Sequence, residues 1–600
     1  MTKKYMMEGK FMRKRVLASA LVLAMAATSL YGCGNDAASG TEGQTAAQEE
    51  TAAASENGTE EAAETGNEET AKEESENTDG ERETLVVGIQ TNTYITDYDD
   101  NYMTNLIEEE LNVNLEFYQL PSTAADMQTK ISLMASSGDE NMPDVFMLSG
   151  GNLTPEQVLD YGTKGFFIPL NSYVEDSESN YAKIPEEDRE KMDAAMTSAD
   201  GNMYALPNYC VSPWNDSPNR MFINGAWLDK LGLEVPKTTD ELYEVLKAFK
   251  ENDANGNGVQ DELGVYGFTD GGYGQDIIDS LMNSFVFYNG GAQNNGLALD
   301  ESGEHVIAPF ATEEWREGLW YMNKLYTEGL LASSTFTDND TAFKATLNSE
   351  TNVVGLTSAG STSNWPDADN NANFLEMDLI EPLTGPNGVC YTPYTEYAPG
   401  ASFFITSSCE NPDLAFKLGD WFMDIDNSRI ARWGEEGVDW TSDPEVCAEH
   451  MNGYVDAGLA DEVNLVYLTN IWSEPSNKYW HNTNSYYEPW EAASGTASGI
   501  APYDATSKNN MLNAQHIEWY YDKHPEHVLP LLHYTSEEAS QCTEAMVSIA
   551  DLVEQAKAEF ITGVRDLDSG WDAYLEELES VGLSSWLEIA QTAYERSQAN

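Results

Sequence analysis

The chain has 600 residues, more than one hydrophobic core usually serves, because cores stop growing at about 250–300 residues and longer chains divide into domains. It carries 30 lysine and arginine residues against 103 aspartate and glutamate residues, a formal net charge of −73. An acidic surface of this strength repels nucleic acids and anionic lipid headgroups, so neither is expected as a binding partner.

The first 33 residues have the pattern of an export signal. Four basic residues between positions 10 and 15 precede an apolar run at residues 16–30, which is shorter than the about 20 residues that a membrane-spanning helix needs. The run ends in Leu-Tyr-Gly-Cys33, which resembles a bacterial lipobox. That resemblance implies that Cys33 receives a diacylglycerol, whose two acyl chains anchor the protein stably to the membrane. Ordinary secretion with an incidental cysteine is the alternative.

Residues 34–83 have the composition of a disordered acidic linker. They contain no large apolar side chain, and they hold 16 acidic residues against 2 basic ones. Such a segment cannot bury enough apolar surface to offset the entropy of ordering. As a flexible coil it would span roughly 40 Å, so a folded body that begins near residue 84 could reach a membrane partner beside its own anchor.

Strands and helices alternate after residue 84. Apolar runs predict strands at residues 85–89, 113–118 and 144–148, and helical patterns lie between them at residues 101–111 and 124–136. This order implies a parallel sheet, and ligands of such sheets bind beyond the carboxyl ends of the strands. The loops that start at Gln90 and Ser149 are therefore expected to line a ligand site. A Pro- and Asn-rich stretch at residues 208–218 is expected to be the first crossing into a second lobe.

A well-marked helix is expected to begin after Thr238. Thr238 and Glu241 form a capping box, in which a hydroxyl and a carboxylate satisfy two backbone N–H groups. Four apolar residues then follow at i, i+3, i+4 and i+7, which is one stripe facing a core: Leu242, Val245, Leu246 and Phe249.

This helix leads into a loop that is similar to an EF-hand calcium loop. Oxygen-bearing side chains occupy positions 1, 3, 5 and 9, Gly258 allows the sharp turn at position 6, and a main-chain carbonyl would bind at position 7. The candidate ligands are Asp253, Asn255, Asn257, Val259 and Asp261. Position 12 is Gly264 instead of the usual glutamate. The alternative is a polar turn that closes the helix without an ion.

Five further cysteines are odd in number, widely spaced and without a C-x-x-C pair, which argues against a zinc site, a redox motif or a disulfide framework. We expect scattered buried thiols at Cys210, Cys390, Cys409, Cys447 and Cys542. His516, His524 and His527 lie close together in sequence, but their spacing fits no zinc motif, so we expect them in solvent.

Several stretches agree with one known family. They are FIPLN at residues 167–171, GNMYALP at 201–207, the segment 219–269, the turn WGEEGVDW at 433–440 and the tail at 560–594. Together they resemble the sugar-binding family of bacterial extracellular solute-binding proteins, especially the subgroup that is similar to alginate-binding proteins. The resemblance covers most of residues 84–600 and is weakest at residues 445–555.

The resemblance implies an α/β fold of the periplasmic-binding-protein-like class (type II). Two α/β lobes would be joined by hinge crossings, with an extended helical C-terminal part. Lobe I would comprise residues 84–210 and 399–445, lobe II residues 211–398, and residues 446–600 would be shared between them. In related proteins a shorter calcium loop is closed by adjacent acids, which are Asp261 and Glu262 here.

The resemblance also implies a function. The protein would be lipid-anchored on the extracellular face of the cytoplasmic membrane, would capture an oligosaccharide as a monomer, and would deliver it to the permease subunits of an ABC importer. Flat aromatic side chains suit the apolar faces of sugar rings. The candidate aromatic sugar contacts, for each of which core or hinge packing is about as plausible, are Tyr94, Tyr209, Trp214, Trp365, Tyr397 and Trp440, and Trp490 also falls in an expected loop. Arg220 is a further candidate, which would hydrogen-bond either the ligand or an acidic partner in a lobe.

Two other classes of protein stay open at the level of sequence. A surface glycoside hydrolase would share export, aromatic residues and a calcium loop, and a structural lipoprotein would share the calcium-stabilised body. The sequence has no H-E-x-x-H, no G-x-S-x-G and no Walker A motif, so we do not expect an enzyme. With 103 acidic residues, a catalytic pair of carboxylates can be neither nominated nor excluded.

Overall fold

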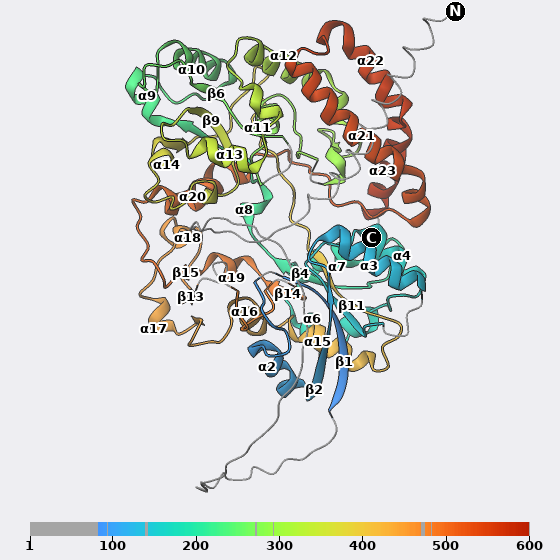
Figure 1. The fold of residues 1–600 in the computed structure, drawn as a ribbon. Coiled ribbons are helices and arrows are strands. Elements are labelled where there is room, and N and C mark those ends of the chain that lie inside the picture. Colours follow the sequence, from blue (N-terminus) through green and yellow to red (C-terminus); the bar gives the residue numbers. More distant parts are fainter. Residues whose placement is uncertain are drawn as a thin grey trace, which may run out of the picture.

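The computed structural model describes residues 82–92, 94–137, 142–269, 273–291, 293–469, 475–481 and 483–598. The expected signal segment, Cys33 and the acidic stretch up to residue 81 lie outside these residues. Two α/β lobes are stacked one above the other, and three long C-terminal helices lie beside the upper lobe (Figure 1). None of the helices in the described ranges is both long enough and apolar enough to cross a membrane.

Lobe I is built on a six-stranded sheet with the order β14-β4-β11-β3-β1-β2. Its strands are β1 (Glu83–Gln90), β2 (Val113–Leu120), β3 (Val145–Met147), β4 (Leu206–Cys210), β11 (Gly400–Ile405) and β14 (Tyr486–Glu488). As predicted, β1 runs parallel to both β2 and β3. Only β11 is antiparallel to its neighbours β3 and β4, while β14 is parallel to β4. The carboxyl ends of the other five strands therefore share one edge.

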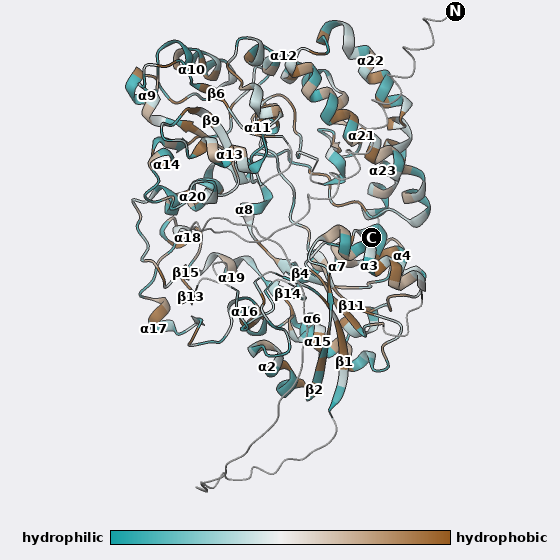
Figure 2. Cartoon of the chain, in the orientation of Figure 1, coloured by the Kyte–Doolittle hydropathy of each residue, from teal (hydrophilic) through white to brown (hydrophobic). Residues whose placement is uncertain are grey.

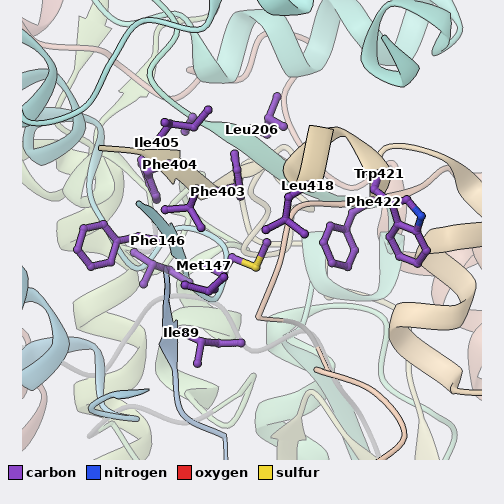
Figure 3. Packing of buried hydrophobic residues seen from close by; sticks show 14 of the residues in the cluster. Ile89, Phe146, Met147, Leu206, Phe403, Phe404, Ile405, Leu418, Trp421 and Phe422 are labelled. Carbon is purple, nitrogen blue, oxygen red and sulfur yellow. The ribbon is translucent and has the colours of Figure 1, made fainter. Parts of the chain in front are cut away.

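The core of lobe I lies between this sheet and its helices. The main helices are α2 (Tyr102–Leu111), α3 (Ala124–Ser137), α4 (Pro155–Thr163), α7 (Glu186–Met196), α15 (Pro412–Trp421) and α16 (Ile425–Trp433), with short α5 (Asn171–Val174) and α6 (Asn180–Lys183). Figure 3 shows Phe403 and Met147 of the strands packed toward Leu418 and Phe422. In Figure 2 the central strands are largely brown, and the solvent-exposed first end of β1 is teal.

One helix predicted in lobe I is broken. The apolar pattern of residues 411–424 predicts a single helix with Trp421 on its buried face, but α15 ends at Trp421 and α16 begins at Ile425. The Asp424 carboxylate accepts hydrogen bonds from the N–H groups of Asp426 and Asn427, and the Asn427 side chain donates to the Trp421 carbonyl. Capping of this kind starts a new helix instead of extending the old one. Trp421 is buried, as predicted.

Lobe II has a four-stranded sheet with the order β10-β5-β9-β6. Its strands are β5 (Arg220–Asn224), β6 (Leu263–Val265), β9 (Val354–Ala359) and β10 (Met377–Leu379). Its helices are α9 (Gly225–Leu231), α10 (Thr239–Glu251), α11 (Ile277–Met282), α12 (Glu313–Thr327), α13 (Asp340–Leu347) and α14 (Ala372–Glu376), and β7 (Ala298–Leu299) pairs with β8 (Val306–Ile307). The capping box of Thr238 and Glu241 is present, and the four-residue apolar stripe of α10 is buried, so both predictions are confirmed.

The C-terminal part divides between the two lobes. A small sheet of β12 (Trp440–Thr441), β13 (Leu465–Tyr467) and β15 (Thr496–Ser498) lies beside lobe I with α17 (Pro444–Cys447), α18 (Gly453–Asp456) and α19 (Trp490–Ser494). The chain then returns to lobe II through α20 (Lys508–His516), a π-helical turn (Ile517–Tyr521), α21 (Ser536–Thr562), α22 (Leu567–Ser580) and α23 (Leu583–Gln598). The apolar face of α21 packs on α12, which makes these helices part of the lobe II core.

The cysteines agree only in part with the prediction. All five of those in the described residues are free thiols, and Cys210, Cys447 and Cys542 are buried. Cys390 and Cys409 are half-buried, so the expectation that all five are buried was wrong for these two. Desolvation is the largest influence on the Cys409 thiol and raises its pKa to about 11, which keeps it protonated and unreactive.

Candidate functional site

Loops from the two lobes face each other across three chain crossings. The first crossing leaves the carboxyl end of β4, passes through α8 (Pro213–Asp216) and enters β5, while the second and third occupy residues 380–399 and 499–507 (Figure 1). Because β9 is antiparallel to β5, its carboxyl end lies where β5 begins. The carboxyl edges of the two sheets are therefore opposed, which is where open α/β sheets bind ligands.

We call the loops at these edges the interlobe face. In lobe I it consists of residues 91–101, 148–154, 432–441 and 475–481, and in lobe II of residues 266–269, 273–276 and 360–366. Residues 475–481 belong to it because Ser476 pairs with Ile95 in an isolated bridge. Residues 432–441 belong to it because Arg432 contacts the last residues of β4 and β14.

A buried glutamine ties the strand-end loops of lobe I together. The Gln90 side-chain oxygen accepts hydrogen bonds from the Ser149 N–H at 3.0 Å and from the Asn152 amide at 2.9 Å. Its amide nitrogen donates to the Ser122 carbonyl at 2.9 Å. Gln90 thus uses both ends of its side chain to fix three loops, including the two that were predicted from Gln90 and Ser149. The wall of the interlobe face is held rigidly before any ligand arrives.

An aromatic pair lies on the first of these loops. The rings of Tyr94 and His481 are stacked with centroids 5.2 Å apart and planes inclined by 10°. Desolvation, aided by the positive charge of Arg432, lowers the pKa of His481 to about 3, so its imidazole is neutral near pH 7. Tyr94 is half-buried, and it stays a candidate sugar contact.

A second group at this edge was missed by the sequence analysis. Arg432 Nη1 lies 3.2 Å from Glu488 Oε2 and 3.3 Å from Cys210 Sγ, at the ends of β14 and β4. The next residue, Trp433, stacks on Tyr467 with centroids 5.2 Å apart and planes inclined by 5°. The sequence did contain a signal for this group, because Trp433 is the first residue of the turn WGEEGVDW that resembles the family pattern.

The turn from Trp433 to Trp440 is anchored from inside. Asp439 is fully buried, accepts a hydrogen bond from the Glu435 N–H at 3.1 Å, and forms an ion pair with Lys478. Trp440 is 1 % exposed and donates its indole N–H to the Gly434 carbonyl at 2.8 Å. Trp440 is therefore a core residue that shapes the turn, and this burial argues against its predicted contact with sugar.

Arg220 and Trp214 form a sealed cluster at the first crossing. Arg220 is fully buried, and its guanidinium carbon lies 3.4 Å from the centroid of the Trp214 ring. It donates to the carbonyls of Trp214 at 3.0 Å and Ser217 at 3.3 Å, and also to that of Gly360 at the end of β9. We expected a ligand or an acidic partner, but among the described residues no carboxylate forms an ion pair with it. Carbonyl oxygens hold it instead.

His516 completes this cluster and corrects a second expectation. Its Nε2 lies 2.7 Å from Ser217 Oγ, and its ring centroid is 5.1 Å from that of Trp214. Desolvation and the charge of Arg220 lower its pKa well below the usual range. The prediction that all three nearby histidines are solvated was wrong here, because α20 packs behind the first crossing. His524 is half-buried and stacks on Tyr394 of the second crossing, while His527 is exposed.

Three more of the predicted aromatic residues can now be placed. Tyr209 is fully buried and donates its hydroxyl to Asp188 at 2.6 Å, and Trp365 is 1 % exposed between Phe222 and Phe374. Both are core residues in this structure. The half-buried Tyr397 accepts a hydrogen bond from the Cys210 N–H at 2.6 Å, and so joins the second crossing to the first. Its predicted contact with ligand is untested.

The expected calcium loop lies on the outer side of lobe II, after α10. Asp253, Gly256 and Gly258 have positive φ angles of 45°, 77° and 81°, which fold the chain sharply back on itself. The amide nitrogens of Asn255 and Asn257 lie 2.8 Å and 3.1 Å from Asp261 Oδ1.

The donor chemistry of this loop fits calcium. Its oxygens come from carboxylates, amides and a carbonyl, which are the ligands that Ca²⁺ prefers, and Glu262 folds back to accept from the Asn255 N–H at 3.3 Å. Rotating the two asparagine amides would bring their oxygens toward Asp261. As the side chains stand, the described residues contain no group of three or more His, Cys, Asp or Glu arranged to hold a metal ion.

Comparisons with known proteins agree with this architecture. Residues 93–427 match the model of the family described as bacterial extracellular solute-binding protein. The fructooligosaccharide ABC transporter substrate-binding protein FusA of Streptococcus pneumoniae serotype 4 is 26 % identical over 524 residues, which cover 84 % of this chain and 88 % of that protein.

Solved structures show the same fold. A human-milk-oligosaccharide-binding (HMO-binding) solute-binding protein of Bifidobacterium longum infantis has a TM-score of 0.69 at 20 % identity, covering 86 % of this chain and 99 % of that one. An EF-hand mutant of FusA in complex with fructo-nystose has a TM-score of 0.66 at 23 % identity, covering 86 % and 100 %. The predicted fold class, two α/β lobes of the type II periplasmic-binding-protein-like class with a helical C-terminal part, is confirmed.

Proposed function

The chain belongs to the family of bacterial extracellular solute-binding proteins, and we propose that it captures an oligosaccharide outside the cell and delivers it to the permease subunits of an ABC importer. The observation that carries this proposal is the opposition of two carboxyl sheet edges across three crossings. The fructooligosaccharide-binding relative, which matches over 84 % of the chain, supports a carbohydrate as the ligand.

The interlobe face has the chemistry that a sugar needs. The half-buried rings of Tyr94 and Tyr467, which stack on the buried His481 and Trp433 respectively, offer aromatic surface to the apolar faces of sugar rings. Amide and hydroxyl groups of the Gln90 loops offer hydrogen-bond partners at the ring edges. Closure of the lobes about the crossings would then enclose the sugar and present the closed form to the permease.

We propose binding without catalysis. A glycosidase needs one carboxyl group able to protonate the glycosidic oxygen and a second at about 5–10 Å. The buried carboxylates of the interlobe edge in lobe I, Glu488 and Asp439, are each engaged by a cation, Arg432 and Lys478 respectively. The family match and the substrate-binding relative make a hydrolase the less favoured alternative.

We also propose that Ca²⁺ binds the loop of residues 253–262. Asp253, Asn255, Asn257, Asp261 and Glu262 would supply side-chain oxygens, and Val259 would supply its carbonyl. The FusA structure altered in its EF-hand supports such a site in a relative. Calcium would stiffen the outer side of lobe II without touching the sugar. Membrane attachment through a lipid on Cys33 rests on the lipobox resemblance alone.

Melting curves test the calcium site. A ligand that binds only the folded state stabilises it by about 2.7 kcal/mol at a hundredfold excess over its dissociation constant. The protein should therefore melt at a higher temperature in millimolar Ca²⁺ than in chelator, and the double variant Asp253→Ala with Asp261→Ala should lose that difference. Equal melting of the unaltered protein in both conditions would show that the loop is only a turn.

Calorimetry with product analysis tests the function. The purified protein is titrated with neutral and acidic plant and host oligosaccharides, and each mixture is then analysed by chromatography. We expect saturable binding of one sugar per chain and recovery of that sugar intact. Steady release of shorter sugars would favour the hydrolase, and binding of no oligosaccharide would contradict the proposal.

A further inference from the structure

The lysine and arginine side chains of the interlobe face indicate whether the captured sugar is charged. Net charge alone does not decide it, because one or two accessible arginines would outweigh a distant acidic surface. The relevant quantity is the number of lysine and arginine side chains that a ligand can reach.

The interlobe face contains very few of them. Its loops hold only Arg432 and Lys478, and the three crossings, residues 211–219, 380–399 and 499–507, hold none. The stretches beside these loops that the structure does not describe, residues 270–272 and 470–474, contain no lysine, arginine or histidine in the sequence. The sequence of these two stretches therefore adds no cation.

Four of the cations in or beside the face are already engaged. Arg432 is paired with Glu488, and the two side chains are only 16 % and 7 % exposed. Lys478 is paired with the buried Asp439, and its own side chain is 42 % exposed. Arg220 is fully buried at the first crossing, and its guanidinium donates to carbonyl oxygens. Lys508, which follows the third crossing, bonds to Asp378 at 2.7 Å. His481, the histidine of the face, is stacked and buried.

Acidic side chains are more numerous there and better exposed. Asp97, Asp99 and Asp100 follow β1, and Glu435 and Glu436 lie on the turn after Trp433, and all five are exposed. A carboxylate on the ligand would enter this negative field, in which the exposed cation Lys478 is already paired with Asp439. Like charges brought together in an interface oppose binding, and this selects against the wrong partner.

We infer that the captured ligand is an uncharged oligosaccharide and that chains of uronic acids are rejected by the interlobe face. This inference rests on the proposed function of the same face. Lys523 is the one further cation close to a crossing: it is half-buried, its carbonyl accepts from the Thr392 N–H, and it forms no ion pair among the described residues. The test therefore includes it.

The experiment compares one sugar in three chemical forms. The full-length protein is first titrated with fructo-, manno- and cello-oligosaccharides and with oligogalacturonate. The tightest neutral binder is then oxidised at its primary hydroxyls to carboxylates, and part of that product is methyl-esterified. We expect the oxidised form to bind at least about tenfold more weakly than its methyl ester, with the gap narrowing at high salt because exposed charges are screened.

Two variants assign the effect to the acidic residues. The double variant Glu435→Gln with Glu436→Gln should reduce the difference in affinity between the oxidised sugar and its methyl ester. The control variant Asp572→Asn with Glu576→Gln, on the remote helix α22, should leave that difference unchanged. Tighter binding of oligogalacturonate or of the oxidised form than of the uncharged forms would overturn the inference and leave the proposed function standing. Loss of such binding in Lys523→Gln would locate the cation responsible. Binding of no sugar in the panel would overturn both.

Discussion

Two clusters in this protein contain the same three residue types and play different parts. At the first crossing Trp214, Arg220 and His516 pack together, and at the interlobe edge of lobe I Trp433, Arg432 and His481 lie near one another. In the first, the arginine is completely buried and is held by carbonyl oxygens. In the second, the arginine is 16 % exposed and is paired with a carboxylate.

The comparison shows that chemical composition alone does not identify a binding site. A tryptophan beside an arginine can either pack inside the hinge or line the ligand site. What separates them is accessibility: at the crossing the fully buried Arg220 guanidinium donates to backbone carbonyls, whereas the edge cluster has the half-buried Tyr94 and Tyr467 beside it. We therefore expect changes in the first cluster to act on stability and changes near the second to act on affinity.

The largest expected effect is at Trp365, a residue predicted from the sequence to touch sugar. Replacing it with alanine should cost about 3–5 kcal/mol of folding free energy, because a large side chain is removed from a packed core. Its effect on sugar affinity, measured in protein that is still folded, should be small. Denaturant unfolding and calorimetry measure the two quantities. A large loss of sugar affinity with little loss of folding free energy would indicate that Trp365 contacts the sugar after all.

Arg220→Met is expected to come next. It should destabilise the protein by about 3 kcal/mol, because the carbonyls of Trp214, Ser217 and Gly360 would lose a buried donor. Arg432→Met is the matched variant at the edge cluster, and it should alter sugar affinity more than Arg220→Met does. If Arg220→Met and Arg432→Met lost the same folding free energy and the same sugar affinity, the two clusters would not differ in role.

The two histidines should give the protein a matched sensitivity to acid. Both have a pKa lowered by desolvation and a nearby arginine, so the unfolded chain binds a proton near pH 6.5 that the folded chain does not. Stability from each is therefore present above pH 6.5 and is lost as the pH falls; for His481, whose pKa in the folded protein is about 3, the loss is about 2 kcal/mol at pH 5. In the variants His516→Gln and His481→Gln, the free energy of unfolding should depend less steeply on pH between pH 5 and 7.5 than in the unaltered protein. An unchanged pH dependence in either variant would contradict the burial of that histidine.

The smallest expected effect is at Tyr94. Tyr94→Ala should weaken sugar binding by about 1–2 kcal/mol, by analogy with aromatic platforms that stack on nucleic-acid bases. The melting temperature should change little, because the side chain is half-buried at a loop. Tyr209→Phe serves as the control, since it removes a buried hydroxyl without touching the interlobe face. An unaltered affinity in Tyr94→Ala would remove this ring from the site.

The sequence was sufficient for much of the fold because periodic patterns are local. Strands β1, β2 and β3 and the capping box at Thr238 follow from local patterns along the chain, whereas the helical C-terminal part was expected from the family resemblance. The break between α15 and α16 was missed because the apolar pattern continues across it. The break arises because the Asp424 side chain caps the first N–H groups of α16. Strand β14 was missed because three residues are too few to show a period.

The site was harder to predict because burial depends on distant parts of the chain. Nothing near Trp214 in the sequence indicates that His516, some 300 residues away, covers it. Arg432 becomes part of the interlobe edge only because α16 packs beside β14 and places it against Glu488. Tyr94 lies in the loop after β1, which was predicted from the order of the strands, and its contact with a ligand stays a prediction.

Hydrogen–deuterium exchange in the presence and absence of a bound oligosaccharide tests the central claim most directly. If the interlobe face captures the sugar, backbone protection should rise in residues 91–101, 148–154, 432–441 and 475–481, and the loop of residues 253–262 should not change. Protection confined to other surfaces, with these four segments unaltered, would contradict the account.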